Sequence, residues 1–133
     1  MAYLLVIVLN KTEKIESILG RFIEVDVRGA TIIDSVGMGR TLESEIPIFG
    51  TLQEILSGGK GKRPENKTIF TVIKEEKTLR DAERVVKEEL SNFKEPGAGI
   101  MFVLPIMDFK GLSPSLKEEE KSLKEHRKIE KII

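Results

Sequence analysis

The 133-residue chain has no cysteine and no tryptophan, and it contains one histidine and one tyrosine. Without cysteine it cannot form a disulfide, a thiolate nucleophile or a cysteine-ligated zinc site, and His126 alone leaves little material for a transition-metal centre. Net charge is also absent, because 22 basic residues balance 22 acidic ones. No overall field draws the chain to nucleic acid or to an anionic membrane, so we expect no nucleic-acid partner.

Long hydrophobic runs are missing as well. The longest apolar stretch, Tyr3 to Leu9, is far shorter than the roughly 20 residues that cross a bilayer, and no cationic segment precedes it as in a signal peptide. We therefore expect a cytoplasmic protein without membrane insertion. The length predicts one compact domain.

Apolar runs of strand length alternate with amphipathic helical stretches. The first helical stretch follows the capping-box-like pair Asn10 and Glu13, and the second follows Thr78 and Asp81. The predicted strands are 3–9, 30–36, 67–74 and 100–106. The resulting order, βαββαβ, predicts an α+β ferredoxin-like sandwich with an antiparallel four-stranded sheet and both helices on one face.

Two of these strands, 3–9 and 100–106, are apolar at consecutive positions and are expected at the centre of the sheet. Two helices cover only one face, so the other face needs a cover too. In a chain this short the simplest cover is another copy of itself. The sequence therefore predicts a closed oligomer.

We divide the chain into a domain at 1–110, with a long excursion at 40–66 between strands two and three, and a charged helical tail at 111–133. The excursion contains an apolar stretch, 46–56, which either packs on the protein's own body or binds a partner. The tail either is a solvated helix or docks on a neighbouring subunit or a partner.

Two segments resemble the PII family of nitrogen-regulatory signal-transduction proteins. Gly29 to Arg40 (GATIIDSVGMGR) is similar to the second strand and the Gly-x-Gly-Arg opening of the family's T-loop, and Gly97 to Ile106 (GAGIMFVLPI) resembles its B-loop and fourth strand. The resemblance covers about Tyr3 to Asp108. It implies a non-enzymatic homotrimer that binds a nucleotide between subunits and signals to a target, such as a transporter or a metabolic enzyme, through the T-loop.

The resemblance and the composition together predict two sets of functional residues. The ligand-binding set is Gly37, Gly39, Arg40 and Thr41 of one subunit with Gly97, Ala98 and Gly99 of a neighbour. The partner-binding set lies in the apolar part of the excursion and comprises Ile48, Phe49, Leu52 and Ile55.

The chain departs from the family at positions that hold phosphates. Ala98 and Ile100 replace the B-loop Asp and Lys, and Gly111 and Ser113 stand where the family has two arginines. Each lost charged hydrogen bond is worth roughly 1.5–3 kcal/mol, so a polyphosphate would bind weakly. We expect no required cofactor and an adenine nucleotide ligand (AMP, ADP, ATP or a cyclic nucleotide), preferably one with few charges.

Other functions compete with a ligand sensor. The sequence offers no paired carboxylates on facing elements, and Asp34 fits an edge or interface charge better than a catalytic base, so we expect no enzyme and no metal site. The alternatives are a ligand-free PII-like oligomeric scaffold for protein contacts and a metal-tolerance protein like the CutA relatives of the same fold.

Overall fold

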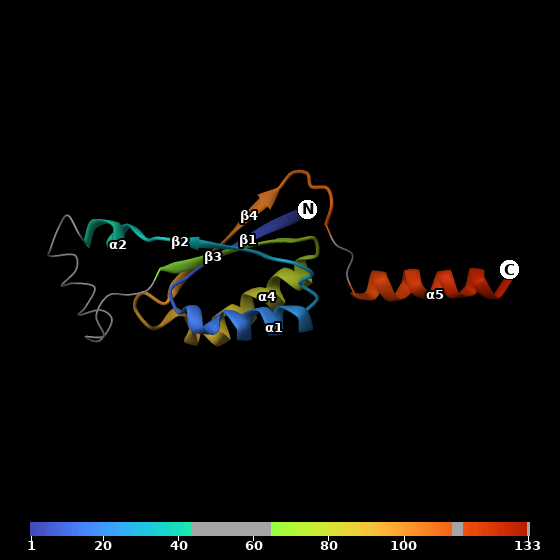
Figure 1. Cartoon of the computed structure of the whole chain (residues 1–133), viewed down its shortest axis with the longest axis horizontal. Coiled ribbons are helices and arrows are strands. Elements are labelled where there is room, and N and C mark those ends of the chain that lie inside the picture. The colour runs from blue at the N-terminus through green and yellow to red at the C-terminus, as the bar shows by residue number, and fades with distance from the viewer. Residues whose placement is uncertain (44–64, 113–115, 133) are drawn as a thin grey trace.

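A computed structural model describes residues 1–43, 65–112 and 116–132 of the chain (Figure 1). In chain order the elements are β1 (Ala2–Leu9), η1 (Thr12–Lys14), α1 (Ile15–Glu24), β2 (Thr31–Ser35), α2 (Met38–Glu43), β3 (Asn66–Ile73), α4 (Glu76–Glu89), η2 (Ser91–Phe93), β4 (Gly99–Ile106) and α5 (Leu116–Ile132). The sheet has four antiparallel strands, and α1 and α4 lie side by side on one face of it (Figure 1). The predicted ferredoxin-like α+β sandwich is confirmed.

The strand order is β2-β3-β1-β4, so β1 and β3 occupy the centre and β4 forms an edge. The prediction that 100–106 is a central strand was therefore wrong. Its continuous apolar sequence favours burial of both faces of the strand but does not fix its position in the sheet. A strand at the edge of one chain can be covered by a second chain. Among the described strands β4 pairs only with β1, from Ala2 opposite Ile106 to Leu9 opposite Gly99.

The core fills the space between the sheet and the two helices. In β1 every second residue from Leu5 points to the helices, and in α1 Ile18 and Phe22 point back. The same cluster contains these fully buried side chains of β3 and α4: Ile69, Leu79, Ala82, Val85 and Val86. The Thr71 hydroxyl enters this layer and donates to the Gly29 carbonyl at 2.6 Å.

Helix starts differ from those predicted. Asn10 and Glu13 form no capping box, because η1 precedes α1 and the Asn10 side chain donates instead to the Gly97 carbonyl at 2.9 Å. Helix α4 begins at Glu76, so Thr78 lies inside its first turn rather than at its cap. The Asn10 side-chain amide thus links the end of β1 to the loop before β4 instead of capping the helix that follows Asn10.

A short helix, α2, stands at the start of the predicted excursion. It begins at Met38 and therefore includes Gly39, Arg40 and Thr41 of the predicted ligand-binding set. Six residues are too few to show a helical repeat of apolar positions, which explains why the pattern missed it. Residues 44–64 of the excursion, including Ile48, Phe49, Leu52 and Ile55, lie outside the described residues.

The C-terminal helix α5 extends away from the sandwich (Figure 1), and its apolar residues Leu123 and Ile129 are more than half exposed. A helix in the tail was predicted, and the position of α5 outside the core fits its thin apolar stripe. None of the helices in the described parts of the chain is both long and apolar enough to cross a membrane.

The sheet face opposite the helices carries several exposed apolar side chains in the single chain. Along β4, Ile100, Phe102 and Leu104 are 57%, 41% and 46% exposed, and Ile33 on β2 is 46% exposed. The register places these side chains on the same face as Val6, because Val6 lies opposite Phe102 and Phe70. We call this surface the open face.

Candidate functional site

The two predicted glycine motifs lie at the same end of the sheet. β2 ends at Ser35, just before Gly37, and β4 starts at Gly99, while the register pairs Ser35 with Asn66 and Gly99 with Leu9. The two motifs nevertheless sit beyond opposite edges of the sheet, because β3 and β1 separate β2 from β4. Three strand spacings amount to about 14 Å, so a single chain does not bring the two motifs together.

The loop that contains Gly97 and Gly99 is held firmly to the end of β1. The Asn10 backbone N–H donates to the Ala98 carbonyl at 3.1 Å, and the Asn10 side chain donates to the Gly97 carbonyl. An ion pair between Lys11 and Glu95 adds a second link, and the hydrogen bond from the Lys11 ammonium holds the pKa of the Glu95 carboxyl below its ordinary value. This loop is therefore preorganised in the single chain.

Ala98 contributes to that rigidity rather than to an open surface. Its side chain is buried, and its N–H donates to the Glu95 carbonyl at 3.3 Å while its carbonyl accepts from Asn10. The small side chain fits because the loop folds back on β1. Among the predicted ligand residues of this loop, Gly97 is the exposed one, and its missing side chain leaves the backbone open to close approach.

Gly99 is required by close packing as well as by its backbone angle. Its φ is +152°, and a Cβ built there would lie 2.4 Å from the Val8 carbonyl oxygen, a distance that real Cβ atoms do not show. Because the obstacle is backbone on the central strand, it cannot move aside cheaply. The glycine thus fixes how closely β4 starts against β1.

On the other edge of the sheet, a small polar cluster marks the base of the excursion. The Ser35 hydroxyl lies 2.8 Å from the Thr68 hydroxyl and donates to the Asn66 side-chain carbonyl, and Asn66 is only 9% exposed. A Cβ on Gly37 would contact the Asn66 amide nitrogen at 3.4 Å. The cluster therefore fixes the point at which β2 leaves the sheet toward α2 and at which β3 begins.

The sequence reasoning missed this polar cluster. Ser35 and Asn66 are separated by 31 positions and become neighbours only through the β2–β3 register. The available signal was weak: a serine and an asparagine stand at the ends of two apolar strands that the same excursion connects.

Asp34 has a partner that the sequence reasoning did not name. It forms an ion pair with Lys67, which lies directly opposite on β3. Because β2 is an edge strand, this agrees with the interpretation of Asp34 as an edge charge. In the described residues, no three histidine, cysteine, aspartate or glutamate side chains are grouped so that they could hold a metal ion.

Comparisons with known proteins do not assign a function to the chain. No protein-family model matches the chain, and no curated protein matches it. A solved structure from Thermus thermophilus, described as that of a candidate PII-like signalling protein, is 20% identical, has a TM-score of 0.45, and covers 77% of this chain and 84% of that one. Similarity at this level assigns no function, so the fold assignment rests on the strand order and register.

Replacing Gly99 by alanine should destabilise the protein. The new methyl group would overlap the Val8 carbonyl, and such overpacking costs about 1–3 kcal/mol of unfolding free energy. Thermal melting measures the loss. Gly20→Ala is the matched control, because Gly20 lies on α1 with open space around it, and alanine there should raise the melting temperature. Equal melting of Gly99→Ala and wild type would contradict the close packing.

Proposed function

We propose that the chain is a non-enzymatic PII-like regulator that binds a small anionic ligand, an adenine nucleotide with few charges, in clefts between neighbouring subunits. The placement of the glycine motifs carries the proposal. Gly37 and Gly99 lie at one end of the sheet but beyond opposite edges of it, so two copies placed edge to edge would bring one motif of each together. A ligand between them would touch both subunits.

The open face supplies the reason for such copies to assemble. Exposed Ile100, Phe102 and Leu104 form an apolar row along the edge strand β4, and Ile33 continues the same face on the other edge strand. Burying apolar surface contributes roughly 25 cal/mol per Å², so this face favours contact with an equally apolar surface. A second and third copy of the chain provide that surface, and we propose a homotrimer.

Placing a charge on the open face should break the assembly. Phe102→Asp puts a carboxylate in the middle of the row on β4, and an unpaired carboxylate is costly to bury. Light scattering at micromolar concentration should give three times the 15.0 kDa chain mass for the wild type and a smaller mass for the variant.

Met107→Asp is the control for this experiment, because Met107 lies just after β4 and is fully exposed. It should leave the mass unchanged. A wild type that is monomeric at micromolar concentration would overturn the trimer.

Arg40 is the residue expected to bind the ligand's phosphate. It lies in α2, directly after the Gly37 motif, and a hydrogen bond from a guanidinium to a phosphate is among the stronger ones in proteins. A thermal-shift screen with AMP, ADP, ATP and cyclic nucleotides identifies the ligand first. By calorimetry, Arg40→Ala should then weaken that ligand about tenfold or more.

Arg84→Ala, on α4 and paired with Asp81, is the control and should bind the ligand as the wild type does. Unchanged affinity of Arg40→Ala would place the site elsewhere. A screen in which no nucleotide stabilises the protein would instead favour the ligand-free scaffold.

The excursion is proposed as the output element, with Ile48, Phe49, Leu52 and Ile55 contacting a target such as a transporter or a metabolic enzyme. Phe49→Ala should leave the oligomer mass and melting temperature nearly unchanged while abolishing capture of the target from cell lysate. A fall in stability of about 3 kcal/mol or more, typical of a buried phenylalanine, with capture intact would make the segment part of the core.

A further inference from the structure

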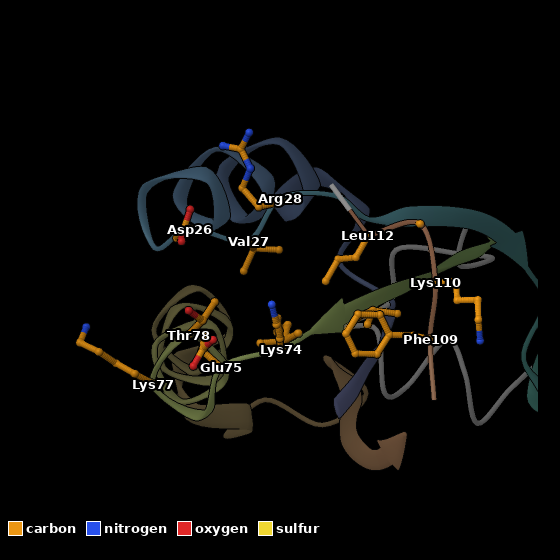
Figure 2. A pocket seen from close by; sticks show the side chains of 13 residues that line it. Asp26, Val27, Arg28, Lys74, Glu75, Lys77, Thr78, Phe109, Lys110 and Leu112 are labelled. Carbon is orange, nitrogen blue, oxygen red and sulfur yellow. The ribbon is translucent and has the colours of Figure 1, made fainter. Parts of the chain in front are cut away.

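A hollow lies at the end of the sheet opposite the glycine motifs. It is a cavity of about 590 Å³ between three segments: the α1–β2 connection, the β3–α4 junction and the segment that follows β4 (Figure 2). Ligand pockets are commonly about 300–1,000 Å³, so the cavity has room for a small molecule. It is lined by residues of one chain and does not require a neighbouring copy.

Apolar side chains from two of these segments face one another across the cavity. Val27 comes from the α1–β2 connection, and Phe109 and Leu112 come from the segment after β4 (Figure 2). Gly111 has a φ of +84°, and this turn in the chain lies between Phe109 and Leu112, which both line the cavity. The cavity therefore has a wall suited to an aliphatic or aromatic group.

Polar groups also line the cavity. Lys74 follows β3, and its ammonium is turned to the space between Val27, Thr78 and Phe109 (Figure 2). Thr78 adds a hydroxyl from the first turn of α4. An ammonium group has three donors, so Lys74 can hold an anion in addition to a partner in the protein.

The other lysines at the cavity point elsewhere. Lys77 pairs with Asp81 along α4, and Lys110 pairs with Asp108, and both side chains lead away from the centre of the cavity (Figure 2). Their position makes Lys77 a useful comparison for Lys74, because the two residues carry the same charge close together in the chain and only Lys74 is turned inward.

We propose that this cavity binds a small organic carboxylate with an apolar body. The carboxylate would meet the Lys74 ammonium and the Thr78 hydroxyl, and the apolar body would lie against Val27, Phe109 and Leu112. Two carboxylates, Asp26 and Glu75, also line the cavity, so an amino acid could place its ammonium beside them. The shared chemistry is the carboxylate with its apolar group.

The lack of tryptophan in the chain allows a direct assay. Phe109→Trp places a single indole in the cavity wall, and Met107→Trp places the same fluorophore nearby, at a fully exposed position outside the lining. 3-Phenylpropanoate should change the emission of Phe109→Trp in a saturable manner and should leave Met107→Trp unchanged. The neutral 3-phenylpropanamide should bind at least about tenfold more weakly, because it lacks the charge.

Two charge-removing variants made in the Phe109→Trp background test the role assigned to Lys74. Lys74→Met should weaken 3-phenylpropanoate about tenfold or more, whereas Lys77→Met, with the same change in net charge, should change the affinity less than about twofold. L-Phenylalanine forms the second arm. Tighter binding of phenylalanine than of 3-phenylpropanoate would identify amino acids as the preferred class, and weaker binding would identify simple carboxylates.

Nuclear magnetic resonance of the unsubstituted chain tests whether 3-phenylpropanoate also binds when no tryptophan has been introduced. The backbone amide signals of Val27, Thr78 and Leu112 should shift with added 3-phenylpropanoate. No shift up to about 10 mM, equal affinity for the acid and the amide, or equal effects of the two lysine variants would each overturn the proposal. These outcomes are independent of the nucleotide and trimer experiments, which probe the other end of the sheet and its open face.

Discussion

The packing of α1 and α4 on the same face of the sheet is the constraint on which the other features depend. Two βαβ units in sequence place both helices on one side, and their apolar stripes bury Leu5, Ile7 and Ile69 from the middle of the sheet. Each fully buried side chain of this size contributes roughly 1.5–3 kcal/mol. The same geometry leaves the second face without a helix. The open face is thus a direct result of how the first face is covered.

The two ends of the sheet carry different structural features. At one end, the close approach of Gly99 to Val8 and the polar cluster around Asn66 fix the exits of the loops. At the other end, the segment after β4 turns at Gly111 and encloses a cavity against α4. The two proposed ligand sites thus lie at opposite ends of the sheet.

Sequence patterns predicted the elements well because each relies on local periodicity, as the buried Ile18 and Phe22 of α1 show. Patterns were less informative about neighbours. The run at 100–106 was placed in the centre because apolar content reports burial and does not report position in the sheet. The glycine motif before β4 was singled out by its resemblance to a family segment, and the positive φ of Gly97 and Gly99 is a local conformation that glycine adopts readily. The cavity and the cluster around Asn66 could not be predicted, because only the sheet brings their distant segments together.

The rigidity of the loop before β4 limits how a signal could start. Asn10 and the Lys11–Glu95 ion pair already hold that loop against β1, and Gly99 leaves no space for β4 to shift toward Val8. A ligand at this end would meet a preformed surface on one subunit and would gain affinity because little ordering is needed there. Any conformational change on ligand binding must then come from the other side of the proposed cleft between subunits. That side is the edge where β2 leads into α2, so the polar base at Asn66 is the point from which a bound ligand could redirect the excursion.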